Sequence, residues 1–256
     1  SERTAVLAPY MHWAKTRPVT TFDLAASNML ACTVDDLPGA REALALAARN
    51  DEGYAPLQAA IATLYDVAPD RVVHAVGCSG ANFLVYGAHL TPGDEVLMER
   101  PGYDPMAGAC RLLGTTVRFF DRPASTGFAV DVDAIRRGLT PRTRLVILTS
   151  PHNPSGAVLD RATLAALDAL AAETGVAVLV DEAYLDIARR LAPRPDDVPR
   201  AATVGGHLIS TSSLTKSFGL NALRCGWAVV PSAAVATRLR RVPDAVHDVA
   251  DTPEAR

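Results

Sequence analysis

The sequence predicts an α/β fold in which a mostly parallel central sheet is covered by helices on both faces. Short apolar runs, such as residues 72–76 and 176–180, alternate along the chain with longer segments of helical period. Strands without polar positions are typical of a parallel sheet that is buried between two layers of helices. The chain has 256 residues, 49% of them hydrophobic, so it is long enough to bury such a sheet.

The first third of the chain is predicted to hold an arm and two helices. Residues 1–35 show neither the helical nor the strand period, and prolines interrupt them, so we expect an N-terminal arm with short elements. Residues 36–256 are expected to form one large domain. Apolar and alanine positions at 39–49 predict its first helix, and the loop 51–57 leads into a second helix that ends near Tyr65.

From residue 72 onward, strands and helices alternate. A β-branched run at 72–76 predicts a strand, and a helical pattern follows at 81–90 before the turn sequence Thr-Pro-Gly-Asp. Asp160 is a typical N-cap and Gly175 is typical of the position just beyond a helix, so a helix is expected between them. Similar patterns predict strands at 95–98, 115–120, 144–149, 176–180, 204–211 and 225–230, helices at 104–113 and 132–137, and an exposed loop at 191–206.

Composition and charge argue against several classes of partner. The formal net charge is −3 with acidic and basic residues scattered, so we expect no nucleic acid as a partner. No apolar run is long enough to span a bilayer, so we expect no membrane partner. The four cysteines lie far apart without a Cys-x-x-Cys pair, which favours reduced thiols in a cytoplasmic protein and no structural metal.

Polar and aromatic residues follow several predicted strands, at the sheet edge where parallel sheets bind ligands. Small residues at 77–82 open a helix whose free amides suit a phosphate, although such a turn is as often only a tight turn. Tyr103 follows the next strand, and Asn153 is held between two prolines in Ser-Pro-His-Asn-Pro-Ser-Gly. Asp181 begins Asp-Glu-Ala-Tyr at another strand end, where a carboxylate serves equally well as a helix cap.

One lysine follows the strand that ends near Ser210. The chain contains 23 arginines and only two lysines, Lys15 and Lys216. Arginine supplies positive charge almost everywhere, so Lys216 stands where a guanidinium would not serve. An amine can lose its proton when it is buried and can form a Schiff base with an aldehyde. With an anion site, a carboxylate and a stacking aromatic, this lysine meets the needs of a pyridine cofactor that carries a phosphate and an aldehyde.

Three motifs together resemble one enzyme family. They are Ser-Pro-His-Asn-Pro-Ser-Gly from residue 150, Asp-Glu-Ala-Tyr from residue 181, and Ser-Leu-Thr-Lys-Ser-Phe-Gly-Leu from residue 213 with Arg-Cys-Gly-Trp from residue 224. In order and spacing they resemble the fold-type I pyridoxal-phosphate-dependent enzymes, class I/II aminotransferases, over residues 38–231. The resemblance implies an aspartate-aminotransferase-like large domain that binds pyridoxal 5'-phosphate.

The resemblance also implies a role for each site residue. Lys216 would form the Schiff base with the cofactor and Asp181 would pair with the pyridinium nitrogen; these two and Tyr184 would be the catalytic residues. Tyr54 would reach the phosphate of a neighbouring subunit, so a homodimer is expected. The other implied cofactor contacts are Asn153 and Tyr184 on the phenolic oxygen, Tyr103 stacked on the ring, and the amides of Gly80, Ala81 and Asn82 with Ser213 and Arg224 on the phosphate.

The implied reaction is transfer of an amino group between an amino acid and a 2-keto acid. Two alternatives remain open: another pyridoxal-phosphate reaction on an amino acid, by a lyase, decarboxylase or oxidase of a biosynthetic pathway, or a truncated remnant that binds the cofactor without turnover. The family's small C-terminal domain, with the arginine that binds the substrate carboxylate, is expected to be missing. The chain also reads Ala26-Ser27-Asn28-Met29 where the family usually has a Gly-x-Pro-type turn.

Overall fold

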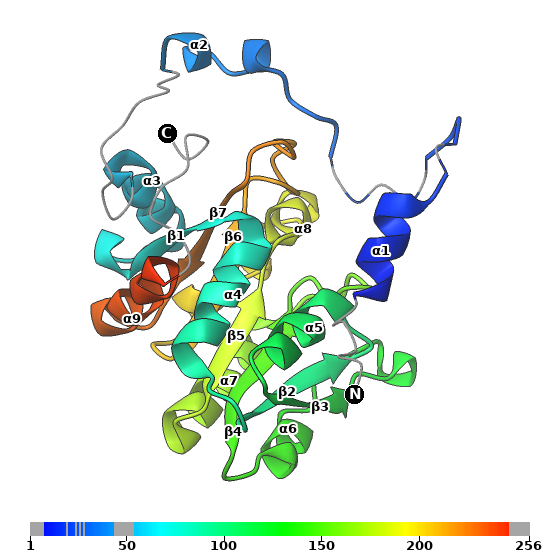
Figure 1. Ribbon diagram of the computed structural model, residues 1–256, viewed down its shortest axis with the longest axis vertical. Coiled ribbons are helices and arrows are strands. Elements are labelled where there is room, and N and C mark those ends of the chain that lie inside the picture. Colours follow the sequence, from blue (N-terminus) through cyan, green and yellow to red (C-terminus); the bar gives the residue numbers. More distant parts are fainter. Residues whose placement is uncertain are drawn as a thin grey trace.

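A seven-stranded sheet forms the centre of the protein (Figure 1). Its strands are β1 (Val72–Val76), β2 (Glu95–Arg100), β3 (Thr116–Asp121), β4 (Thr143–Thr149), β5 (Ala177–Asp181), β6 (Leu208–Ser213) and β7 (Cys225–Val229). They lie in the order β1-β7-β6-β5-β4-β2-β3. β7 is antiparallel to both of its neighbours and every other pair is parallel, which confirms the predicted α/β sheet. The computed structural model describes residues 8–18, 20–23, 25, 27, 29–43 and 54–245.

Helices cover both faces of this sheet. In the described part of the chain they are α1 (Pro9–Thr16), α2 (Ala40–Ala43), α3 (Ala55–Tyr65), α4 (Gly77–His89), α5 (Asp104–Leu112), α6 (Val132–Gly138), α7 (Arg161–Thr174), α8 (Leu185–Leu191) and α9 (Ala233–Asp244). Ile209 of β6 packs in one apolar cluster with Leu84 of α4 and Leu239 of α9. The preceding residue, Leu208, packs in another cluster with Leu167 of α7. Because neighbouring side chains of a strand point to opposite faces, α4, α5 and α9 cover one face and α6 and α7 cover the other.

Most predicted boundaries agree with the structure to within a few residues, with two exceptions. α4 begins at Gly77 instead of residue 81, and β6 begins at Leu208 instead of residue 204. Of the helix predicted at 39–49, Ala40–Ala43 is helical, and residues 44–49 lie outside the described part of the chain. The early start of α4 matters for the site, because it moves the free amides of the first helical turn.

The segment between α8 and β6 is more buried than predicted. The prediction of an exposed loop at 191–206 is wrong in part, because Arg200 and Ala201 are buried. The Arg200 guanidinium lies 4.7 Å from the centre of the Tyr65 ring and pairs with the carboxylate of Asp186. These contacts tie the segment to α3 and α8. It forms two short 3₁₀ turns, η4 (Pro195–Asp197) and η5 (Ala201–Thr203). Elsewhere in the described residues, 3₁₀ turns occur at η1 (Val34–Asp36), η2 (Pro69–Arg71) and η3 (Ala124–Thr126).

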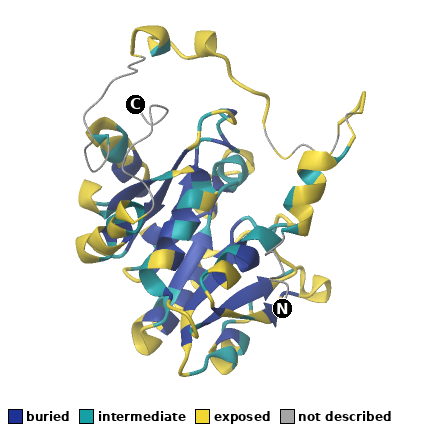
Figure 2. Ribbon diagram, viewed as in Figure 1, coloured by how far each residue is buried: buried dark blue, intermediate teal, exposed yellow. Residues whose placement is uncertain are grey.

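The described residues before residue 44 run from α1 to α2 over the outside of the molecule (Figure 1). α1 contacts α5, where the backbone N–H of Tyr10 donates to the Asp104 carboxylate (3.2 Å). Large apolar side chains of this segment are exposed, including Phe22 at 84% and Leu30 at 93% (Figure 2). The division of the chain into an arm at 1–35 and a large domain stays a prediction.

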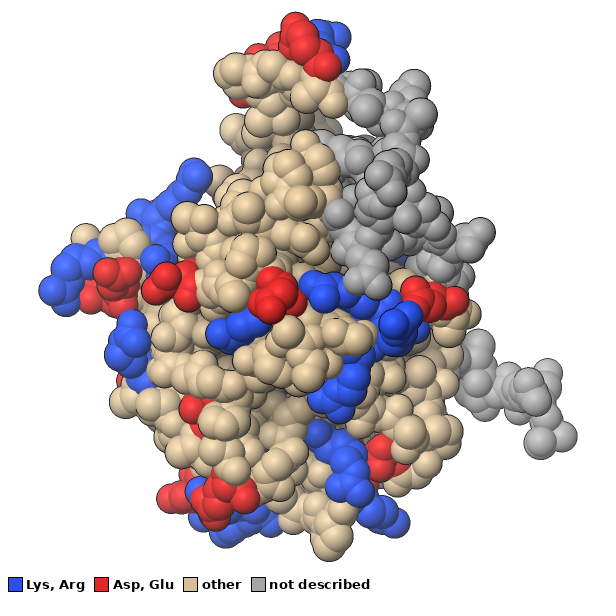
Figure 3. Space-filling view, turned by 90° about the vertical axis from the view of Figure 1, so that its left-hand side faces the viewer, with Lys and Arg blue, Asp and Glu red and all other residues tan. Residues whose placement is uncertain are grey.

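Charged side chains of both signs lie among one another on the face that Figure 3 shows. Within the described ranges, no helix combines the length and the apolar character that crossing a membrane requires. The same residues hold no group of three or more His, Cys, Asp or Glu side chains that is placed to bind a metal ion.

Candidate active site

A cavity of about 230 Å³ lies beyond the carboxyl ends of β4, β5 and β6. Thr149, Asp181 and Ser213, which are the last residues of these three strands, all line it. This is the position that parallel sheets favour for ligands. Residues predicted from the sequence that line the cavity are Tyr103, Asn153, Asp181, Tyr184, Ser213, Lys216 and Arg224.

Residues near the N-terminal end of the chain also line the cavity, and no sequence motif indicated them. Tyr10 and Met11 of α1 line it, as does Ser27 beyond the helix. The Tyr103 hydroxyl donates to Met11 Sδ (3.1 Å), and the rings of Tyr10 and Tyr103 meet edge to face at 6.0 Å. Burial raises the pKa of Tyr103 to about 12, so its hydroxyl stays protonated. The other residues of the lining are Ala14, Thr149, Pro151, Ala183 and Thr215, together with Cys78 and Ser79 from the small residues at 77–82.

Hydrogen bonds hold Asp181 in place at the end of β5. Asn82 Nδ2 donates to Asp181 Oδ2 (2.7 Å), and the backbone N–H of Ala183 donates to Asp181 Oδ1 (3.0 Å). The amide oxygen of Asn82 accepts in turn from Thr211 Oγ1 (2.6 Å), which fixes its orientation. Burial raises the pKa of Asp181, and the hydrogen bonds from Asn82, Ala183 and Cys78 oppose that rise. Asn82 therefore acts through its side chain on Asp181.

The start of α4 presents residues two positions earlier than those predicted. Cys78 and Ser79 line the cavity, whereas Gly80, Ala81 and Asn82 do not. The amides that lack an intrahelical partner belong to the first turn of a helix. Because α4 begins at Gly77, these amides lie at Cys78 and Ser79.

Lys216 enters the cavity from the loop after β6. Its Nζ donates to Ser27 Oγ (2.9 Å) and lies 5.9 Å from the centre of the Tyr184 ring. Burial lowers the pKa of Lys216, and the positive charge of Arg224 lowers it further. More of this amine is therefore neutral near pH 7 than in an exposed lysine.

Two glycines bring Arg224 against the start of α4. A Cβ atom on Gly226 would lie 2.3 Å from the carbonyl carbon of Gly77, so β7 and α4 approach each other at a distance that only glycine permits. Gly77 has φ +70°, and a Cβ atom there would lie 2.9 Å from Arg224 Nη2. The guanidinium therefore lies beside the positive end of the helix dipole, where two sources of positive potential suit an anion.

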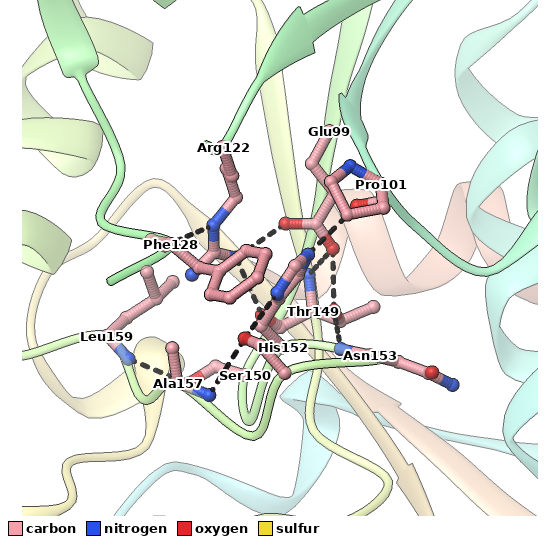
Figure 4. A network of polar contacts seen from close by, with 11 residues as sticks. Glu99, Pro101, Arg122, Phe128, Thr149, Ser150, His152, Asn153, Ala157 and Leu159 are labelled. Carbon is pink, nitrogen blue, oxygen red and sulfur yellow. Dashed lines mark hydrogen bonds and ion pairs between the residues drawn. The ribbon is translucent and has the colours of Figure 1, made fainter. Parts of the chain in front are cut away.

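A buried network of polar side chains supports the turn that carries Asn153 (Figure 4). Glu99 Oε1 accepts from the backbone N–H of Thr149 (2.8 Å) and from its hydroxyl (2.5 Å). Glu99 Oε2 accepts from Arg122 Nη1 at 2.6 Å, and both side chains are almost fully buried. The Thr149 hydroxyl accepts from the backbone N–H of Asn153 (2.9 Å), and Figure 4 shows the Asn153 side chain pointing away from the network.

The same network fixes the far side of the turn. His152 Nε2 donates to the carbonyl of Pro101 (2.9 Å), which joins the turn to the segment after β2. Burial lowers the pKa of His152, which favours the neutral ring. The turn is thus anchored by backbone and side-chain contacts before any ligand binds, so the position of Asn153 is set by the protein itself.

Comparison with known proteins assigns the chain to a family. Residues 22–248 match the model of aminotransferase class I and II. The chain belongs to this family. It is 37% identical over 201 residues to a probable N-succinyldiaminopimelate aminotransferase of Mycobacterium tuberculosis. This match covers 72% of this chain and 48% of the relative. Capreomycidine synthase of Streptomyces vinaceus is 34% identical over 188 residues, covering 72% of this chain and 46% of the relative.

Solved structures of aminotransferases share the fold. The Thermus thermophilus aspartate aminotransferase with maleate has a TM-score of 0.81 at 25% identity, and the match covers 99% of this chain and 68% of that one. The aspartate-aminotransferase-like architecture implied by the sequence is thereby confirmed. The chain spans about half the length of the curated relatives that it matches.

Class I and II aminotransferases use pyridoxal 5'-phosphate, and the cavity of this family member fits that cofactor. Thr215 Oγ1 is buried there and has no hydrogen-bond partner within the described residues, so a ligand in the cavity can satisfy it. Arg224 and the first turn of α4 provide positive charge for a phosphate. Asp181 provides a negative charge for a protonated ring nitrogen. The donors and acceptors thus match both charged ends of the cofactor.

Gly226→Ala should separate β7 from α4 and lower both stability and cofactor affinity. The added methyl group must displace the Gly77 backbone, and overpacking of this kind costs about 1–3 kcal/mol of unfolding free energy. Urea denaturation and titration with pyridoxal phosphate would measure the two effects. Gly206→Ala is the matched control, because nothing lies within 4 Å of a Cβ atom there. Equal stability of the two variants would contradict the prediction.

Tyr54 does not line the cavity of its own chain. It immediately precedes α3, and its backbone N–H donates to His74 Nδ1 (3.3 Å). A role for Tyr54 at the site of a neighbouring subunit stays a prediction.

Proposed function

We propose that this chain is part of a pyridoxal-phosphate-dependent aminotransferase that moves an amino group between an amino acid and a 2-keto acid. The observation that carries this proposal is that Lys216 and Asp181 line one cavity, with Asp181 at the end of β5 and Lys216 just after the neighbouring parallel strand β6. A partly neutral amine and a buried carboxylate are the two groups that this chemistry requires. Membership of the aminotransferase family supports the same reaction.

The polar groups of the cavity suggest how the cofactor is held. Arg224 and the hydroxyl of Ser213 would bind the phosphate together with the first turn of α4, and the position of that turn favours the amides of Cys78 and Ser79. Asp181 would bind the ring nitrogen at the other end. The remaining roles that we propose are hydrogen bonds from Asn153 and Tyr184 to the phenolic oxygen and stacking of Tyr103 on the ring.

The protein's own contribution to the reaction follows from its charges. When bound, the cofactor supplies an aldehyde for amino groups and a ring that stabilises negative charge at the α-carbon of the substrate. Asp181 favours the protonated ring nitrogen by its opposite charge. Lys216 accepts the α-proton, because burial and Arg224 lower its pKa. Tyr10 and Met11 would lie beside the bound cofactor, because both line the cavity.

We extend the proposal to the assembly and the location of the protein. The chain would act as a homodimer in the cytoplasm, with Tyr54 reaching the phosphate of the neighbouring subunit. Residues 1–35 would act as an arm on a cofactor-binding domain at 36–256.

The visible absorbance of the purified protein with pyridoxal phosphate tests the reaction. We expect a band that one amino acid of a panel bleaches, with release of the matching 2-keto acid, and that a 2-keto acid then restores. A band that no amino acid bleaches, or the absence of any band, would contradict the proposed transfer.

A second candidate function is another reaction on the same cofactor. It is favoured by a relative that is named as a synthase, capreomycidine synthase, instead of an aminotransferase. The two candidates differ in their need for an acceptor. Continuous turnover of an amino acid without any added 2-keto acid would support the second candidate and exclude transamination as the main reaction.

A further inference from the structure

Two parts of the chain that lie far apart in sequence meet at the lysine loop. The described residues of the segment 27–32, which we call the strap, lie against the backbone that follows Lys216. At one end, Ser27 Oγ accepts from Lys216 Nζ at 2.9 Å. At the other end, the backbone N–H of Cys32 donates to the carbonyl of Gly219 (2.9 Å), and Cys32 Sγ donates to the carbonyl of Phe218 (3.5 Å). The strap is therefore fastened at both ends.

The lysine loop is shaped to accept the strap. Gly219 has φ +72°, a conformation that residues with a side chain rarely adopt. A Cβ atom on Gly219 would lie 2.4 Å from the carbonyl oxygen of Leu30 and 3.2 Å from Cys32 Sγ. Glycine thus satisfies two requirements at this one position, the turn of the loop and the close approach of the strap.

The Ser27 hydroxyl is placed to join two groups of the cavity. A hydroxyl can accept two hydrogen bonds and donate one. Ser27 accepts from Lys216, and its hydrogen bond with Tyr184 opposes the rise that burial causes in the tyrosine pKa. Lys216 Nζ itself lies 5.9 Å from the centre of the Tyr184 ring. Ser27 therefore links the amine to Tyr184.

We propose that Ser27 is a positioning residue, which the strap holds in place and whose hydroxyl keeps the protonated amine of Lys216 beside Tyr184. The importance of this contact for catalysis rests on the proposed function, although the contact itself does not. The sequence already differs from its family here, since Ser27 stands near the usual Gly-x-Pro-type turn. Other titratable groups that line the cavity with Lys216 are Tyr10, Cys78, Tyr103, Asp181, Tyr184 and Arg224.

The titration of Lys216 in the cofactor-free protein tests this proposal. Because the chain has only two lysines, trace acetylation between pH 6 and 11, followed by mass spectrometry, reports each amine separately, and exposed Lys15 is the internal reference. Ser27→Ala removes an acceptor that favours the charged amine, so the Lys216 pKa should fall by about one unit. Ser27→Thr keeps a hydroxyl, so the Lys216 pKa of this variant should stay close to the wild-type value.

Two further variants separate positioning from general damage to the arm. Gly219→Ala should displace the strap without altering Ser27 and should move the Lys216 titration in the same direction. Thr33→Ala, which removes a hydroxyl from the same arm away from the cavity, should leave it unchanged. An unchanged Lys216 titration in folded Ser27→Ala and Gly219→Ala proteins would overturn the proposal. Since no cofactor or substrate is added, failure of the proposed transamination would not affect this result.

Discussion

Lys216→Arg should abolish amino transfer while leaving the protein folded. Arginine keeps the positive charge, but its guanidinium stays protonated at neutral pH, so it can neither add to an aldehyde nor accept the α-proton. Loss of the general base alone lowers the rate by about 10²- to 10⁴-fold. Formation of the 2-keto acid in a single turnover, with the amino acid that bleaches the wild-type band, would measure the loss.

Lys15→Arg is the matched control for this substitution. Lys15 is the other lysine of the chain, is exposed on α1 and does not line the cavity. It should react at the wild-type rate. A Lys216→Arg protein that stays within tenfold of this control would show that another group acts as the base.

Arg122→Met should destabilise the protein more than any surface substitution. The Arg122 and Glu99 side chains are only 1% and 2% exposed, and their charged atoms lie 2.6 Å apart. Removing one partner of a buried pair leaves an uncompensated charge and costs about 3–5 kcal/mol. Because Glu99 also holds Thr149, the turn that carries Asn153 should loosen as well, and pyridoxal phosphate should bind more weakly. Urea denaturation at neutral pH measures the stability.

The loss of stability that Arg122→Met causes should depend on pH and should be larger at high pH than at low pH. Burial raises the pKa of Glu99, and Arg122 opposes that rise. Without the arginine, the pKa of Glu99 rises further, so the folded protein binds a proton more readily than the unfolded chain. The loss of stability is therefore largest at high pH and becomes smaller as the pH falls through the raised pKa.

An exposed ion pair of the same length provides the control. Arg136 Nη1 lies 2.6 Å from Glu173 Oε1, and the two side chains are 41% and 61% exposed. Solvent screens such a pair, so Arg136→Met should cost far less stability than Arg122→Met. If both arginine substitutions changed stability equally, burial would not be the cause of the effect at Glu99.

The residues that follow apolar strands could be placed from the sequence. Asn153, Asp181 and Lys216 each come shortly after a run that reads as a buried strand. Parallel strands end at one edge of the sheet, so residues beyond their ends meet without any knowledge of the tertiary contacts. The order of the motifs along the chain indicated the enzyme family. In the structure, these three side chains line the same cavity.

Contacts between distant segments could not be predicted in this way. Ser27 meets Lys216 across 189 positions, and the arm has no period from which a contact could be read. Glu99 in β2 and Arg122, just beyond the end of β3, are 23 positions apart, and no local pattern joins them. The sequence predicts too late a start for α4, because Gly-Cys-Ser-Gly is a typical turn sequence, whereas in the structure it packs against β7 as the first helical turn.

The reversed direction of β7 has a consequence for how this site tolerates changes in chain length. β6 and β7 form a hairpin, so one connection carries both the amine of Lys216 and the guanidinium of Arg224. The span between these two groups is a covalent length, set by residues 217–223, whereas Asp181 belongs to a separate strand, β5, which pairs with β6. An insertion or deletion in 217–223 would change the separation of the two cations and leave the carboxylate where it is.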